Sequence, residues 1–294
     1  MYKLPVIQTV IDAYRFTFGQ WRWVLAYAAP LLILIVLLAL VGAYFSADNR
    51  DMPGPVFALF AIVVVGGLAL AVGFAVAMHR HYLIGPDPRG IKTILTWQRR
   101  HWRFLGGAIL ISIAMGLLSA LFLVPIFAAF ALNLPGIINA TFNNLLLSGL
   151  INSVIGLAIW SLVFMIVCSS LLKFPLRAIE APDEDFETTD RLVHGNIRRM
   201  TAVFILGDFI PFTIFDYALS AWWGVSAGAQ TLGVEPASIG LALSEQIFTV
   251  VYVLGGLLWL AVTAVMLSMI YKQLSENVTL PEKLPAMPSA SDPA

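Results

Sequence analysis

The sequence predicts an all-α integral membrane protein: six membrane-spanning helices arranged as three helical hairpins, with short cytoplasmic helices at the membrane surface. Hydrophobic residues make up 60% of the 294 residues and charged residues only 12%, and the mean hydropathy is +0.87. A globular protein has about 25% charged residues. The chain therefore lacks the polar surface of a water-soluble enzyme, and its composition also excludes a disordered protein or a disulfide scaffold.

Six segments are long and apolar enough to cross a bilayer, which requires about 20 residues. They cover residues 24–45, 56–78, 105–132, 145–172, 201–223 and 247–271. With their connections they form a single transmembrane domain, residues 1–274. The remaining residues, 275–294, are rich in Pro, Ser and Ala, a composition that cannot bury a core. We expect them to form a disordered cytoplasmic tail.

The distribution of basic residues predicts the orientation of these spans. Alternating loops place sixteen of the seventeen Lys and Arg residues on one side and only Arg50 on the other. Basic residues accumulate on the cytoplasmic side of short loops, so both termini are predicted to be cytoplasmic. Acidic and basic residues are equal in number, so the net charge does not indicate a nucleic-acid partner.

A cytoplasmic segment introduces each pair of spans. In the first, Val6, Val10, Tyr14 and Phe18 are spaced as one apolar stripe of a helix lying in the membrane interface. Residues 91–103 suggest a second such helix, and the more polar residues 188–199 a third. We call these three segments, 6–18, 91–103 and 188–199, the collar.

Two interpretations of the collar stay open at this point. Its segments are either plain connectors among the lipid headgroups, or a surface that binds anionic lipid or a protein partner on the cytoplasmic side. The candidate contact residues are Arg99, Arg100, Arg103, Arg198 and Arg199.

Several short motifs resemble a known group of proteins. These are the run from Gly19 to Trp23, Pro30 early in the first span, and the run from His79 to Gly85 after the second. They resemble a group of uncharacterised bacterial six-span membrane proteins, similar to the membrane domain of some glycerophosphodiester phosphodiesterases. The resemblance implies a bacterial inner membrane and three paired helices. It implies no catalytic residues, because the catalytic part of those phosphodiesterases is a separate soluble barrel.

Two carboxylates, Asp208 and Asp216, lie inside the fifth span. Ionisable groups are costly in a membrane and are functional candidates by default. Their spacing separates them by about 80° around a helix, so both can face one cavity. Pro211 removes an internal hydrogen bond and Gly207 loosens the same turn, and together they favour a kink or break there. One interpretation is an ion or solute site, as in transporters with broken helices. The other is that the two carboxyls are protonated or hydrogen-bonded to neighbouring helices, or that the fifth span is a poorly inserted packing helix.

No other pattern in the sequence indicates chemistry. His79, His81, His101 and His194 lack the spacing of a structural zinc site, and no nucleophile or cofactor motif is present. We therefore expect a non-catalytic membrane protein, without cofactor or metal, that organises lipid or partner proteins through the collar. The alternative is a small-solute or ion transporter that uses Asp208 and Asp216.

Overall fold

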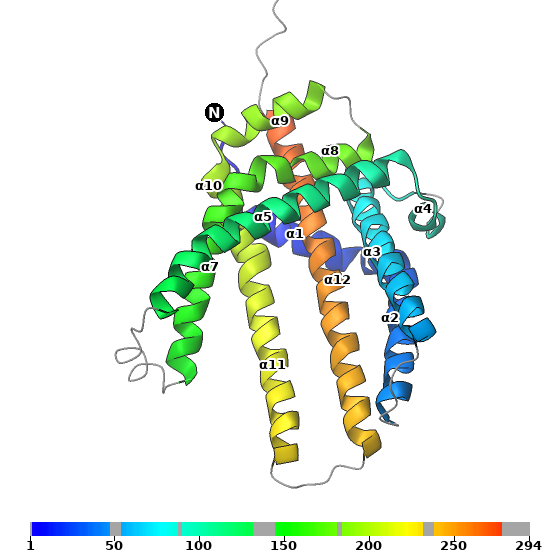
Figure 1. Cartoon of the computed structure of the whole chain (residues 1–294). Coiled ribbons are helices and arrows are strands. Elements are labelled where there is room, and N and C mark those ends of the chain that lie inside the picture. The colour runs from blue at the N-terminus through cyan, green and yellow to red at the C-terminus, as the bar shows by residue number, and fades with distance from the viewer. Residues whose placement is uncertain are drawn as a thin grey trace, which may run out of the picture.

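The computed structural model describes residues 2–47, 54–87, 90–131, 145–180, 184–231 and 238–277, and all regular structure within these ranges is helical (Figure 1). The helices are α1 (Val6–Gly19), α2 (Trp21–Ala47), α3 (Gly54–Leu83), α4 (Lys92–Leu95), α5 (Arg99–Ala131), α7 (Leu145–Leu171), α8 (Lys173–Ile179), α9 (Glu184–His194), α10 (Ile197–Phe204), the π-helical turn η1 (Ile205–Phe209), α11 (Ile210–Thr231) and α12 (Ser238–Asn277).

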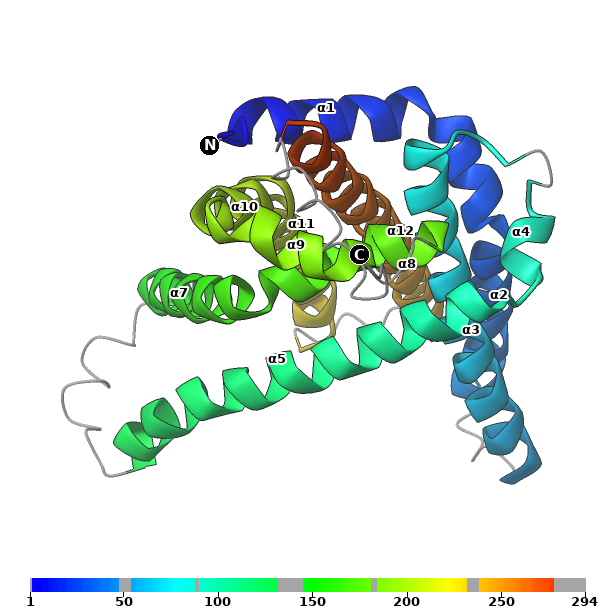
Figure 2. The ribbon, with the colours of Figure 1, turned by 90° about the horizontal axis from the view of Figure 1, so that it is seen from above.

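Six helical segments are long and apolar enough to cross a membrane, which confirms the predicted fold class. They pair as α2 with α3, α5 with α7, and α10–η1–α11 with α12. Helix α12 packs against α1, α2 and α3, and Figure 2 shows it between α1 and α5, which run along opposite edges. Three residues of the expected tail, 275–277, continue α12, and the rest of that tail lies outside the described residues.

The buried core lies in the half of the bundle next to the N-terminal helix. Every residue from Val72 to Met78 except Gly73 is a buried hydrophobic residue, and in α12 the same holds for most positions from Ala261 to Ile270. Elsewhere the spans expose large apolar side chains such as Ile62, Leu117 and Ile214, each at least 65% exposed. Soluble monomeric proteins rarely expose large contiguous apolar surfaces. In this membrane protein such side chains face lipid.

The surface helices differ in length from the sequence pattern. Helix α1 agrees with the first segment, but α4 has only four residues, because the chain is extended at Thr96. A new helix, α5, then begins at Arg99, and the Nδ1 atom of His101 accepts a hydrogen bond from the Gln98 backbone N–H at 2.9 Å. The third segment forms α9 and α10, and α10 continues directly into the fifth span.

Candidate functional site

Helix α1 has three different faces. At about 100° per residue, three sets of side chains point in mean directions that are roughly 90° to 140° apart. One set is buried against the bundle, one is apolar and exposed, and one is polar. The buried set is Thr9, Ala13 and Thr17, the exposed apolar set is Ile7, Ile11 and Phe18, and the polar set is Gln8, Asp12 and Arg15. Three such faces fit a helix that lies in the membrane plane and contacts protein, lipid and water at once.

The residues of the predicted apolar stripe do not all lie on the same face of α1. Val6, Val10 and Tyr14 are partly buried against the core, whereas Phe18 is 54% exposed. The innermost positions are instead small residues, such as Ala13, which lets the helix backbone approach the bundle closely.

The N-terminal segment is held to α10 by side chains of that helix and its N-cap. Asn196, 1% exposed, accepts from the Leu4 backbone N–H at 3.1 Å and donates to the Tyr2 carbonyl at 3.2 Å. Arg199 donates through Nη1 to the Leu4 carbonyl at 2.9 Å. One predicted contact residue, Arg199, therefore also fixes the entry to α1.

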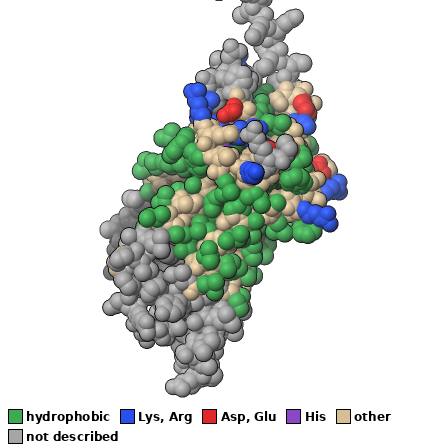
Figure 3. Space-filling model, turned by 90° about the vertical axis from the view of Figure 1, so that its right-hand side faces the viewer, with side chains coloured by type: hydrophobic (Ala, Val, Ile, Leu, Met, Phe, Trp, Pro, Cys, Tyr) green, Lys and Arg blue, Asp and Glu red, His purple; other side chains and the backbone are tan. Residues whose placement is uncertain are grey.

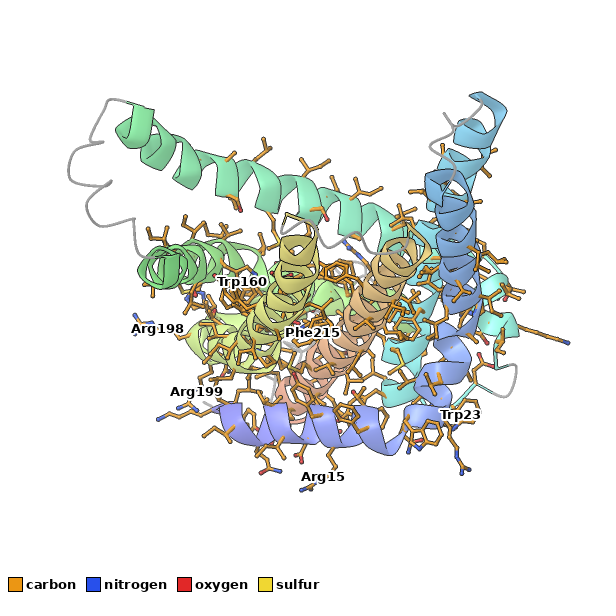
Figure 4. The ribbon with its side chains drawn as sticks, turned by 90° about the horizontal axis from the view of Figure 1, so that it is seen from below. Arg15, Trp23, Trp160, Arg198, Arg199 and Phe215 are labelled. Atoms are coloured by element: carbon orange, nitrogen blue, oxygen red, sulfur yellow. The ribbon has the colours of Figure 1, made fainter. Side chains whose placement is uncertain are left out.

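The other predicted collar residues divide into exposed and buried groups. Arg99 and Arg198 are exposed, and Figure 4 shows Arg15, Arg198 and Arg199 pointing outward from the edge of the bundle. Arg100 differs from the expectation, because it is only 7% exposed and its Nη1 atom lies 3.8 Å from Glu180 Oε2. Its charge is directed into the protein.

Arg103 lies beside two basic residues that the sequence analysis did not select. Together with Lys173 and Arg177 of α8 it lines a pocket of about 410 Å³, which Gly106, Gly107 and Leu110 complete. Arg103 lies near the start of α5, whereas Lys173 and Arg177 lie in α8, which follows α7, the second helix of the same hairpin. Only the packing of α5 against α8 brings the three together.

The fifth span is interrupted at the expected place, by the π-helical turn η1. There the Ile210 backbone N–H donates to the Ile205 carbonyl, five residues earlier. Pro211 has no N–H to offer the Gly207 carbonyl, its partner in a regular α-helix. The Tyr14 hydroxyl donates to that carbonyl instead, at 2.9 Å.

Two side chains of α12 also donate hydrogen bonds at this break. Thr263 donates to the Asp208 carboxyl at 2.9 Å, and the Trp259 indole N–H donates to the Asp208 carbonyl at 3.0 Å. Asp216 is half-buried two turns further along α11 and, among the described residues, shares none of these partners. Burial, and secondarily the Asp208 carboxylate, raises the pKa of the Tyr14 phenol. Tyr14 therefore keeps its proton and remains a donor.

Gly207 is required by the close approach of α12 to this turn. A Cβ at this position would lie 2.5 Å from Met266 Sδ and 3.3 Å from Val10 Cγ2. The absence of a side chain lets η1, α1 and α12 meet, which places the three donors within reach of the break.

The histidines form separate structural contacts. His79, 2% exposed, bonds through Nδ1 to Ser268 Oγ at 2.8 Å, and Ser268 itself donates to the Ala264 carbonyl. His81 lies among the rings of Phe16, Trp23 and Tyr27. Within the described ranges, no group of three or more His, Cys, Asp or Glu residues is placed to hold a metal ion.

These features define a multi-pass integral membrane protein with an amphipathic N-terminal helix packed against its bundle and a hydrogen-bonded break in its fifth span. No family model, curated protein or solved structure matches the chain. The resemblance to the group of bacterial six-span proteins stays a prediction.

Proposed function

We propose that this protein is a non-catalytic component of a bacterial inner membrane, with both termini in the cytoplasm, and that it organises anionic phospholipid at the inner leaflet through its collar. The observation that carries the proposal is the position of the charges. On the face in Figure 3, the charged side chains of the described residues gather toward one end, above an apolar surface. Basic residues at this level attract anionic headgroups.

The three faces of α1 support the same proposal. Ile7, Ile11 and Phe18 are exposed on one side of the helix, and Arg15 is exposed on another. A helix with this arrangement sits at the boundary between acyl chains and headgroups, so the exposed cations near it lie at the depth of the lipid phosphates.

Lipid analysis of the purified protein tests the proposal. The full chain is extracted from membranes of known composition, and its retained lipid is compared with the bulk membrane by mass spectrometry. We expect enrichment of anionic phospholipid that decreases in a variant with Arg99→Gln and Arg198→Gln, both exposed positions. Arg50→Gln is the control, because the sequence places Arg50 on the opposite side. A wild-type lipid composition equal to the bulk would refute the proposal, and loss of a co-purifying protein would indicate a protein partner instead.

The orientation has its own test. A reporter active only in the cytoplasm is fused to the C-terminus or inserted after Asp51. Activity at the C-terminal position is expected, and activity restricted to the insertion after Asp51 would reverse the assignment.

A second candidate function is transport of an ion or small solute, and the observation that favours it is a carboxylate at a break in a span. The Asp208 carboxyl and the carbonyls of Gly207 and Asp208 nevertheless have protein partners, an arrangement that accounts for Asp208 as a structural residue. Labelling of an Asp208→Cys, Cys168→Ala variant with a charged, membrane-impermeant thiol reagent separates the two. Rapid labelling from water favours transport, and protection favours the structural role.

A further inference from the structure

The pocket between α5 and α8 combines positive charge with open space. Three of its six lining residues are cations, Arg103, Lys173 and Arg177, and two are glycines. Among the described residues, those that line the pocket include no acidic side chain, and the Oδ1 atom of Asp190 lies 3.5 Å from Lys173 Nζ at its edge. The charges of these four side chains therefore sum to a positive value, which favours an anionic ligand.

Contacts of Arg177 fix the inner wall of the pocket. A Cβ at position 107 would overlap the Arg177 guanidinium, so Gly107 lets this group lie directly across α5. The guanidinium also lies 5.7 Å from the centre of the Phe174 ring, which is buried and packs at 4.6 Å on Phe104. A cation placed over an aromatic ring in this way is held in position.

The pocket also lies at the right depth for a lipid headgroup. Arg103 is in the second turn of α5, and α8 follows the end of α7, so both walls are at the polar ends of spans. Below Gly106, the same side of α5 carries exposed apolar residues spaced three or four positions apart. These are Leu110, Ile113, Leu117 and Leu121, with exposed fractions of 68%, 55%, 69% and 66%. The cationic pocket thus continues into an apolar stripe along the helix.

We propose that this pocket binds the phosphate of an anionic phospholipid, with an acyl chain lying along the stripe below it. The proposal rests on the proposed function and assigns a site to it. Guanidinium groups bind phosphate oxygens through paired hydrogen bonds, and Lys173 adds a point charge. A volume of about 410 Å³ accommodates a phosphate with its glycerol, and the apolar stripe favours a lipid over a free phosphate.

Binding to the full chain in neutral detergent tests the site. Dissociation constants are measured by native mass spectrometry for phosphatidylglycerol, for phosphatidylcholine with the same acyl chains, and for glycerol phosphate. We expect a preference for phosphatidylglycerol. The variants Arg103→Gln, Lys173→Gln and Arg177→Gln should each weaken its binding about fivefold, the usual contribution of one basic residue near an anionic membrane surface, and the triple variant about a hundredfold.

A variant that keeps all three charges separates a pocket from a general charge effect. A Cβ at Gly106 would have no atom within 4 Å, so Gly106→Leu fills the pocket without a backbone clash. We expect it to weaken phosphatidylglycerol binding about as much as the triple variant. Gly116→Leu is the matched control, because that position on the same helix is equally open and lies outside the pocket lining. It should bind as the wild type does.

The outcomes distinguish this site from the proposed function. Unchanged binding in the triple and Gly106→Leu variants, with anionic lipid still enriched on the full chain, would overturn the site alone. No preference of the wild type for phosphatidylglycerol over phosphatidylcholine would overturn both. Glycerol phosphate binding as tightly as the lipid would replace the lipid with a soluble phosphate. Protection of the buried Cys168 from a maleimide confirms that each variant is folded.

Discussion

Removing the Tyr14 hydroxyl should destabilise the fifth span, although Tyr14 precedes its partner Gly207 by 193 residues in the sequence. In Tyr14→Phe the Gly207 carbonyl loses the hydrogen bond from the phenol, and Pro211 offers no N–H to replace it. A buried carbonyl left without a partner costs about 1–3 kcal/mol, and Gly207 is buried. At about 2 kcal/mol, the ratio of folded to unfolded protein falls roughly thirtyfold.

The single cysteine provides the assay for this prediction. Cys168 is 1% exposed, so a fluorogenic maleimide reacts with it only when the helices around it separate. Unfolding is followed by this reaction as sodium dodecyl sulfate is added to protein in mild detergent. Tyr252→Phe is the matched control, because Tyr252 lies on the exposed side of α12, 41% exposed, and should show no comparable loss.

The same substitution in a Pro211→Ala protein tests whether the missing proline N–H explains the loss of stability. Pro211→Ala restores an N–H that can donate to the Gly207 carbonyl if the turn relaxes to a regular α-helix. Tyr14→Phe should then cost less than half of what it costs in the wild type. An equal cost in both backgrounds, or a cost no larger than that of Tyr252→Phe, would refute the explanation.

Three further predictions concern neighbouring contacts. Gly207→Ala should lower the unfolding free energy by about 1–3 kcal/mol, because the new Cβ meets Met266, whereas Gly116→Ala should not lower it; the maleimide assay compares them. Asn196→Ala should speed hydrogen exchange at residues 2–9 by removing both bonds to the N-terminal segment, and unchanged exchange would contradict the assigned role. Asp208→Asn should keep normal membrane yield and melting temperature, since an amide oxygen still accepts from Thr263; a clear drop in either would show that the charge itself is needed.

Much of the membrane architecture follows from local properties of the sequence. The six spans were predictable because the bilayer sets a minimum length of apolar residues. Helix α1 was predictable from its 3.6-residue periodicity, and a break near Gly207 and Pro211 from the missing N–H of proline. Each of these signals lies within about 25 consecutive residues, a distance over which pattern and structure correspond directly.

Contacts between helices were decided only by the tertiary structure. Lipid tails and protein interiors are similarly apolar, so hydropathy does not show which side of a span faces lipid and which faces another helix. The sequence therefore did not indicate that Tyr14 and Thr263 converge on the fifth span, or that Arg100 turns inward to Glu180. It likewise did not bring Arg103 to Lys173 and Arg177, because that pocket exists only where α5 packs against α8.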